Sequence, residues 1–391
     1  MTQHTIGHCM KKLLVVSDPP AAPGYLPRVR YLCDYLVRRG YDVTLLTEEY
    51  QPLDFAHSYP VETIRMYSGT TADWFVKSVR TLLSDWHNRV FAQRALRQLQ
   101  ITNHKNEVNR ALVAEKSQTT NTSYDLVLCT TFSDFPLGAA RRIANTLNVP
   151  LVCDIRDLDE QVANSRYQYR HRNMLLMPFR WLYRMIHIHR RNNVLRTADA
   201  VTTVSPWHAD FIRRLNPNVH VVYNGFDEAQ FYPRDTKTEN FQVTYIGSLF
   251  DWQKEALAKV QQITPVTIHT PQNDPVPHDR LGDAIRQSSV MLVLTSKDTH
   301  GMLTTKFYEA LGCEKPVLCV PSDQGELAQL MTYTNAGMAT DDPQKIKAFI
   351  DEKRQEWQQH GFTRQQTRHR EEFSREAQCR KLEEIIQQYL S

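Results

Sequence analysis

Short apolar runs alternate with amphipathic stretches along the whole chain. Residues 11–17 form an apolar run of strand length, residues 28–39 carry apolar side chains at helical spacing, and Gly40 ends that stretch before a second apolar run at 41–47. Strand, helix and strand in this order make a βαβ unit, which predicts a parallel sheet. The same half has further predicted helices at 74–99 and 136–147, and further predicted strands at 125–130, 149–154, 199–204 and 220–223.

The pattern breaks at residues 224–227, where the sequence Asn-Gly-Phe-Asp is typical of a turn, and a polar stretch follows at 234–240. Strands are then predicted again, at 241–246, 266–269, 290–294 and 316–320, and an amphipathic helix is predicted at 370–390. We therefore expect an α/β fold with two Rossmann-like parallel-sheet domains. Their predicted bounds are 1–223 and 241–369, with a linker at 224–240 and a terminal helix within 370–391.

Composition adds limits to this picture. The 391 residues are 41% hydrophobic and 23% charged, with a net charge of +4, which is an ordinary globular balance and does not require a polyanionic partner. No apolar stretch approaches the roughly 18 residues of a membrane-spanning helix, and the first ten residues lack the apolar core of a signal peptide. We therefore expect a cytoplasmic protein. The cysteines lack metal-site spacing and indicate buried thiols in a reducing compartment, at Cys33, Cys129, Cys153, Cys313 and Cys319.

Candidate chemistry should follow the strands, because ligands of open α/β sheets bind beyond the carboxyl ends of the strands. The loop at 18–28 contains Gly24, which allows a close turn before a helix, but it lacks the GxGxxG pattern of dinucleotide binding. Asp154, Arg156 and Asp157 follow a predicted buried strand. Arg156 is there either a structural partner of the two carboxylates or a ligand of phosphate and sugar.

The second half offers a stronger candidate at residues 300–311. Thr304 or Thr305 can cap a helix, and the helix amides together with Lys306 suit a diphosphate. Glu309 lies about one turn further on and can accept hydrogen bonds from both hydroxyls of a ribose. The alternative is a capped amphipathic helix with a solvated lysine. Gly247, at the end of another predicted strand, either allows a phosphate to approach the backbone or simply ends the strand.

Seven stretches, taken together and in this order, carry a resemblance to a known family. They are SDPPAAPGYLPRVRYL, DIRDLDEQ, ADAVTTVSPWHADFI, VVYNGFDEAQFYP, VTYIGSLF, GMLTTKFYEALGCEKPVL and FSREAQCRKLEEIIQQYL. The chain resembles the retaining glycosyltransferases of the GT-B fold, in particular the large bacterial family with a Glu-x7-Glu motif. The resemblance implies two Rossmann-like domains that face each other across a cleft, with the terminal helix packed back on the first domain.

The resemblance also implies a set of roles at the donor side. Glu309 matches the second glutamate of the motif, which binds the nucleotide ribose, whereas the first glutamate falls at Gly301 in this chain. The arginine that often follows the glycine at 247 is replaced by Ser248. Lys254 is a candidate for the second cation on the diphosphate, and Lys306 can supply the charge that Ser248 lacks. The implied donor-binding residues are Gly24, Gly247, Ser248, Lys254, Gly301, Thr304, Thr305, Lys306 and Glu309.

The implied reaction moves a hexosyl group from a nucleoside-diphosphate-sugar to a glycan or a lipid-linked acceptor, with retention of anomeric configuration, in surface polysaccharide assembly. Lys306 would stabilise the leaving diphosphate, and Asp157 would act on the acceptor side together with Asp154 and Arg156. We expect no metal and no cofactor, because cationic side chains can do this work. Two alternatives remain open: a GT-B-fold sugar-nucleotide epimerase, and a catalytically silent protein that only binds a sugar nucleotide.

Residues 166–196 predict a further partner. The eight arginines of this segment are interleaved with aromatic and aliphatic residues, and no acidic residue occurs between Glu160 and Asp199. Such a segment suits an anionic membrane surface, while a core-packing helix with a solvated basic face is the alternative and nucleic acid is disfavoured. Because the acceptors of the resembling family are often lipid-linked, we expect peripheral attachment to the inner face of the membrane.

Overall fold

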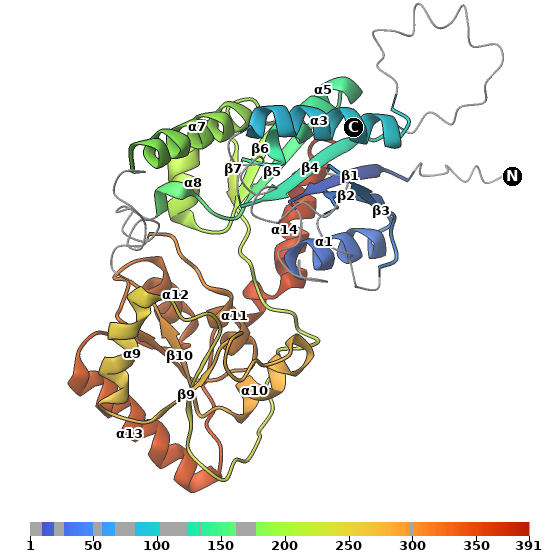
Figure 1. Ribbon diagram of the computed structural model, residues 1–391. Coiled ribbons are helices and arrows are strands. Elements are labelled where there is room, and N and C mark those ends of the chain that lie inside the picture. The colour runs from blue at the N-terminus through green and yellow to red at the C-terminus, as the bar shows by residue number, and fades with distance from the viewer. Residues whose placement is uncertain are drawn as a thin grey trace, which may run out of the picture.

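The computed structural model describes residues 10–18, 27–49, 57–66, 83–101, 123–132, 134–161, 177–296 and 300–390. Within these residues the chain forms two separate parallel sheets, one of seven and one of five strands, each flanked by helices (Figure 1). The prediction of an α/β protein with two parallel-sheet domains is therefore confirmed.

The seven-stranded sheet has the order β3-β2-β1-β4-β5-β6-β7. Its strands are β1 Lys12–Ser17, β2 Asp42–Glu48, β3 Val61–Ile64, β4 Leu126–Thr131, β5 Leu151–Ile155, β6 Ala200–Thr203 and β7 Val219–Val221. The order reverses between β1 and β4, so the crevice beyond their carboxyl ends is where this type of sheet binds ligands.

Helices cover both faces of this sheet because successive side chains of a buried strand point to opposite faces. Leu14 and Val16 pack with the layer formed by α3 Ser84–Gln98, α5 Leu137–Leu147, α7 Met177–Leu195 and α8 Pro206–Arg213. Leu13 and Val15 pack in the opposite layer, with α1 Pro27–Arg38 and the terminal helix α14 Arg375–Gln387.

The five-stranded sheet has the order β12-β11-β10-β8-β9 and reverses between β8 and β10. Its strands are β8 Val243–Ile246, β9 Val266–His269, β10 Val290–Leu294, β11 Val317–Val320 and β12 Gly337–Ala339. Its helices are α9 Lys254–Gln261, α10 Leu281–Gln287, α11 Thr305–Gly312, α12 Glu326–Thr334 and α13 Pro343–His360.

Two chain segments run side by side where the domains join. The amide of Phe226 donates to the Phe373 carbonyl at 3.0 Å, and the Arg375 amide donates to the Phe226 carbonyl at 2.8 Å. Gly225 adopts φ +64°, and a Cβ there would lie 2.8 Å from the Phe373 carbonyl oxygen. Only a residue without a side chain fits this close approach in a left-handed conformation.

The terminal helix lies beside α1 (Figure 1). Tyr35 of α1 donates its hydroxyl to Glu383 of α14 at 2.6 Å, and Arg39 contacts the same carboxylate at 3.0 Å. The helix expected at 370–390 begins only at Arg375. Ser374 caps it by accepting from the Ala377 amide, and a 3₁₀ turn, Arg370–Phe373, precedes it.

Most predicted strands lie within two residues of the observed ones, whereas the short strands β3 and β12 were missed. Of the predicted helix at 74–99, residues 84–98 form α3 and residues 74–82 lie outside the described residues. The predicted buried thiols are confirmed as free and buried, at Cys33, Cys129, Cys153, Cys313 and Cys319.

Candidate active site

The candidate donor site lies beyond the carboxyl ends of β8 and β10, where the order of the second sheet reverses. Gly247 directly follows β8, and α11 begins a few residues after β10. Lys306 of α11 extends over Gly247, so that a Cβ built on this glycine would lie 2.5 Å from its Cε and 2.8 Å from its Nζ. The Lys306 ammonium also lies 5.5 Å from the centre of the Tyr245 ring. Gly247 is therefore required for the position of this lysine.

The first turn of α11 keeps polar groups available. Thr304 occupies the N-cap position, but its hydroxyl makes no capping hydrogen bond, and Thr305 is exposed. The amides at this helix start carry partial positive charge, which suits an anion. Lys306 adds a full charge beside them. The arrangement brings together Gly247, Thr304, Thr305 and Lys306, as a diphosphate site requires.

Glu309 lies one turn beyond Thr305 and is half-buried. Burial raises the pKa of its carboxyl, while Arg375 and then Lys306 act in the opposite direction. Burial likewise lowers the pKa of the Lys306 ammonium, and the Glu309 charge opposes this shift. The two side chains therefore support each other's charged forms. Arg375 comes from α14, so a residue outside the second sheet also acts on this carboxylate.

Gly301 contacts the first domain instead of an open cleft. Its φ is +64°, and a Cβ there would lie 2.7 Å from the Ser205 hydroxyl and 3.2 Å from Trp207, at the start of α8. The neighbouring His300 stacks on Trp207 at 5.7 Å and donates its amide to the Gln161 carbonyl at 2.9 Å. A side chain at position 301 would therefore meet Ser205 and Trp207 in a left-handed backbone conformation, which favours glycine here.

Glu326, the first residue of α12, makes a second contact across the domains. Its carboxylate accepts a hydrogen bond from the Trp207 backbone amide at the start of α8. Burial raises the pKa of Glu326, and the bonds from Trp207 and Ser205 partly oppose this. His208, two residues into α8, shares a 2.9 Å hydrogen bond with the Gln161 side chain. Burial, assisted by Arg191, lowers the pKa of His208 to about 4.

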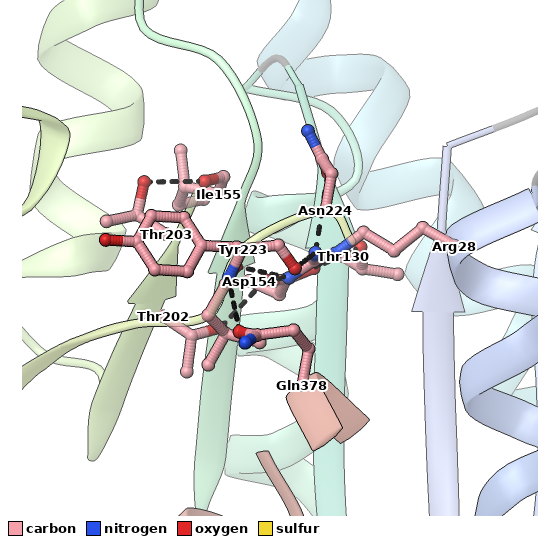
Figure 2. A network of polar contacts seen from close by, with 10 residues as sticks. Arg28, Thr130, Asp154, Ile155, Thr202, Thr203, Tyr223, Asn224 and Gln378 are labelled. Atoms are coloured by element: carbon pink, nitrogen blue, oxygen red, sulfur yellow. Dashed lines mark hydrogen bonds and ion pairs between the residues drawn. The ribbon is translucent and has the colours of Figure 1, made fainter. Parts of the chain in front are cut away.

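On the acceptor side, Asp154 lies beneath the surface of the cleft. Its carboxylate is fully buried and accepts two bonds from Arg28 at 2.9 and 3.0 Å, and one each from Thr130 and Thr202 at 2.8 Å. Figure 2 shows these side chains converging on Asp154 from α1 and from two neighbouring strands. Since it has no exposed oxygen, Asp154 positions other residues and does not reach an acceptor.

Arg28 extends this network to the chain segment at Val222 and Tyr223 that leads from the first domain to the second, here called the crossover. It donates to the carbonyls of Val222 and Tyr223 at 3.1 and 2.7 Å, and Gln378 of α14 accepts from the Tyr223 amide at 2.7 Å (Figure 2). The crossover is thereby held between α1 and α14. The role of Arg28 could not be read from the sequence, since its partner Asp154 lies 126 residues away.

Arg156 and Asp157 lie nearer to solvent than Asp154. Arg156 donates to Asp18, at the end of β1, at 2.6 Å, and its guanidinium lies 5.2 Å from the centre of the Phe132 ring at the end of β4. The Asp157 side chain is exposed, but nearby protein desolvates its carboxyl and raises its pKa, which Arg156 and Gln161 partly oppose. Of the predicted acceptor-side carboxylates, only Asp157 is open to a substrate.

The remaining predicted donor residues are placed less closely. Ser248 is exposed, and its carbonyl accepts from the Tyr245 hydroxyl at 2.6 Å. Lys254, at the start of α9, is 64% exposed and pairs with Asp251 at 2.7 Å. Gly24 lies outside the described residues. Within the described part of the chain, no group of three or more His, Cys, Asp or Glu side chains is arranged to hold a metal ion.

The basic segment forms α7 from Met177 onward, and residues 166–176 lie outside the described residues. Its arginines turn toward the protein more than the sequence suggested: Arg190 binds Ser84 at 2.7 Å, Arg191 forms two bonds with Glu160, and Arg184 donates to the Asp159 carbonyl. Four large apolar side chains of α7 are also exposed, at Trp181, Leu182, Met185 and Ile186. None of the described helices is long and apolar enough to cross a bilayer.

Solved structures share this architecture over nearly the full chain. A sucrose-phosphate synthase from Thermosynechococcus elongatus superposes with a TM-score of 0.64 at 17% identity, covering 97% of this chain and 98% of that one. Anabaena HepE in complex with UDP and glucose gives 0.60 at 14% identity, with 97% and 100% covered. A putative UDP-N-acetylglucosamine 2-epimerase from Listeria monocytogenes gives 0.53 at 11% identity, with 97% and 96% covered. These likenesses establish the GT-B fold.

The family follows from the sequence models. The model of Glycosyltransferase Family 4 matches residues 28–230, and a model described as glycosyl transferase-like matches residues 230–384. The chain belongs to glycosyltransferase family 4, and the expectation that it is a glycosyltransferase is confirmed. No match was found among curated proteins.

Proposed function

We propose that this glycosyltransferase moves a hexosyl group from a nucleoside-diphosphate-sugar to a glycan or lipid-linked acceptor, with retention of anomeric configuration, in surface polysaccharide assembly. The observation that carries the proposal is the placement of Lys306 over Gly247 at the N-terminus of α11. HepE, which has the same fold, is seen with UDP and glucose, and a diphosphate fits the positive charge at this helix start.

The donor is bound through its nucleotide and its diphosphate. The diphosphate oxygens lie against the amides of the first turn of α11, the free hydroxyl of Thr304 and the Lys306 ammonium. Glu309, one turn away, accepts hydrogen bonds from the ribose hydroxyls. Burial raises the pKa of Glu309 and so disfavours its charged form. Two ribose donors and the nearby Arg375 oppose this effect, because hydrogen bonds and positive charge near the carboxylate favour the charged form.

In the reaction, the bond between the anomeric carbon and the diphosphate oxygen breaks, and a bond to the acceptor oxygen forms on the same face of the sugar. Charge grows on the leaving diphosphate, where Lys306 and the helix amides stabilise it. The acceptor hydroxyl loses its proton to Asp157 or to the departing phosphate oxygen. Because side chains and amides neutralise the leaving group, we propose a metal-independent reaction.

The acceptor side includes a membrane contact in this proposal. Trp181, Leu182, Met185 and Ile186 occupy positions i, i+1, i+4 and i+5, which is one face of α7. Large exposed apolar side chains gathered on one face mark interaction surfaces. An interfacial helix would hold the enzyme where a lipid-linked acceptor is found.

The test uses a panel of nucleotide sugars with purified protein, with and without EDTA. Transfer, or slow donor hydrolysis to free sugar, supports the proposal; interconversion of the sugar without transfer supports the epimerase; binding without turnover supports a silent binding protein.

Two variants then assign the donor site. Lys306→Ala should lower turnover by about 100-fold with a smaller effect on nucleoside diphosphate binding, since charge on the leaving group peaks in the transition state. Glu309→Ala should weaken nucleoside diphosphate binding by about 10-fold or more. Lys259→Ala, an exposed lysine paired with Glu255 on α9, is the matched control. Turnover and affinity equal to wild type in both site variants would refute this assignment.

A further inference from the structure

Phe132 is an exposed aromatic residue at an unusual place in the fold. It directly follows β4, at the point where the order of the seven-stranded sheet reverses, and its surface is 46% exposed. The side chains of β4 before it are buried throughout. A large apolar side chain left open at the ligand-binding edge of a parallel sheet offers apolar area to a ligand.

Polar groups from two other strands surround this ring. The Arg156 guanidinium, from the end of β5, lies 5.2 Å from the ring centre and is tied to Asp18 at the end of β1. The Arg156 Nε is buried and has no hydrogen-bond partner within the described structure. Asp157, the next residue, is open to the cleft. An exposed ring and an incompletely bonded guanidinium therefore meet at one place, and an exposed carboxylate directly follows the arginine in the chain.

The chemistry of this group selects a class of ligand. A pyranose ring presents C–H groups on its faces and hydroxyls around its edge, so it can pack on an aromatic ring while its edge hydrogen-bonds to Arg and Asp. A cation held over an aromatic ring is itself stabilised by the ring, which keeps the guanidinium in place. The candidate nucleotide ligands of the described structure, Lys306 and Glu309, belong to the other domain, which favours the acceptor as the occupant of this place.

We propose that Phe132 and Arg156 form an acceptor subsite, in which a hexopyranose ring of the acceptor packs on Phe132 and one of its hydroxyls accepts a hydrogen bond from Arg156. Asp157 then lies beside the sugar that carries the reacting hydroxyl. This inference rests on the proposed function, since it names the acceptor for that transfer as a sugar and not a bare lipid or protein group.

The test measures binding of octyl glycosides of glucose, galactose, mannose and N-acetylglucosamine, below their micellar concentrations, in the presence of saturating UDP. Phe132→Ala should weaken binding of the preferred glycoside by about 10-fold. Phe132→Trp should keep the wild-type affinity, because the aromatic surface is what the subsite requires. Tyr232→Ala is the matched control: Tyr232 is also exposed and carries Arg286 at 4.3 Å, but Arg286 precedes β10 at the opposite end of its sheet.

Four outcomes decide between the possibilities. Weaker binding in Phe132→Ala but not in Tyr232→Ala supports the subsite. Equal affinity in wild type and Phe132→Ala overturns it, as does a wild-type protein that binds none of the four glycosides. A wild-type protein that binds a glycoside through Phe132 but neither transfers nor hydrolyses any nucleotide sugar would instead contradict the proposed function. Thermal unfolding of each variant confirms that a lost signal is not lost folding.

Discussion

Asp154 illustrates how a single buried charge organises this site. Moving a carboxylate out of water is costly, and here four donors from Arg28, Thr130 and Thr202 offset that cost. Burial acts to raise its pKa, but Arg28 and the threonine hydroxyls outweigh burial and hold the pKa below its ordinary value. The ion pair with Asp154 fixes the Arg28 side chain, which in turn donates hydrogen bonds to the carbonyls of Val222 and Tyr223 in the crossover.

Asp154→Asn should therefore destabilise the protein strongly, because it leaves Arg28 buried without a counter-charge. We expect a loss of about 3–5 kcal/mol in the free energy of unfolding, measured by urea denaturation. Asp42→Asn, which breaks an exposed pair with Lys12 at 3.6 Å, should cost no more than about 1 kcal/mol. Comparable losses in the two variants would contradict the structural role of Asp154.

The pH dependence of this contribution has a defined sign. Because the folded pKa of Asp154 lies below the unfolded value of about 3.9, its stabilisation is present above that value and is lost as the pH falls toward the folded pKa. The Asp154→Asn protein, if it folds, should lose less stability than wild type over that acid range. If it does not fold, Thr202→Val removes one of the four bonds and should cost about 1 kcal/mol.

Residue types at strand ends were sufficient to propose Lys306, Glu309 and Asp157 as candidates, because chemistry placed just after a strand is a local signal. They were insufficient for Arg28 and Glu326, whose partners lie 126 and 119 residues away and become neighbours only through the order of the strands. Gly301 was visible as a departure from a pattern. The close approach of Ser205 and α8 to this glycine was not.

At the scale of elements, α7 differs most from its sequence-based interpretation. Arginines interleaved with aromatic and aliphatic residues suggested a segment that lies on an anionic membrane surface, but Arg190 and Arg191 bind Ser84 and Glu160 of their own domain. The sequence could not show this, since charge pattern alone does not tell which face of a helix packs. The terminal helix shows the same limit at its start: its amphipathic pattern continues back to residue 370, whereas the Ser374 cap begins the helix at Arg375.

The membrane contact of α7 should accordingly depend on apolar side chains more than on charge. Replacing Trp181 and Ile186 together with Ser should release the protein from liposomes in sedimentation assays, and wild-type binding should survive a rise in salt, since apolar insertion is not screened. Tyr333→Ser, an exposed aromatic change on α12, is the control. Binding that is abolished by salt in wild type, or unaffected by the double substitution, would argue against this helix face.

At the scale of the whole molecule, the two domains meet at two kinds of contact. One is the crossover, where Phe226 pairs with the Phe373–Arg375 segment and is braced by Arg28 and Gln378. The other joins the start of α8 to Gly301 and Glu326. The first consists of continuous chain and two backbone bonds, whereas the second consists of one backbone bond, from the His300 amide to the Gln161 carbonyl, and a few side-chain contacts. The second contact is therefore the one that can open while the chain stays folded.

Glu326 should control that opening. Glu326→Ala removes the acceptor for the Trp207 amide and leaves the start of α8 without this cap, so the domains should separate more often and the radius of gyration measured by X-ray scattering should rise. Glu326→Gln keeps an acceptor oxygen without the charge, so it resembles protonated Glu326 and its scattering should match that of wild type at low pH. Because burial raises the pKa of Glu326, the closed contact binds a proton more readily than the open one, so wild type should close further as the pH falls through that raised pKa. Glu326→Gln should lack this response.

Glu372→Ala is the control, because within the described residues this carboxylate bonds to Tyr333 and His369 of its own region. If Glu326→Ala scatters as wild type does at every pH, the two domains are held together without this contact.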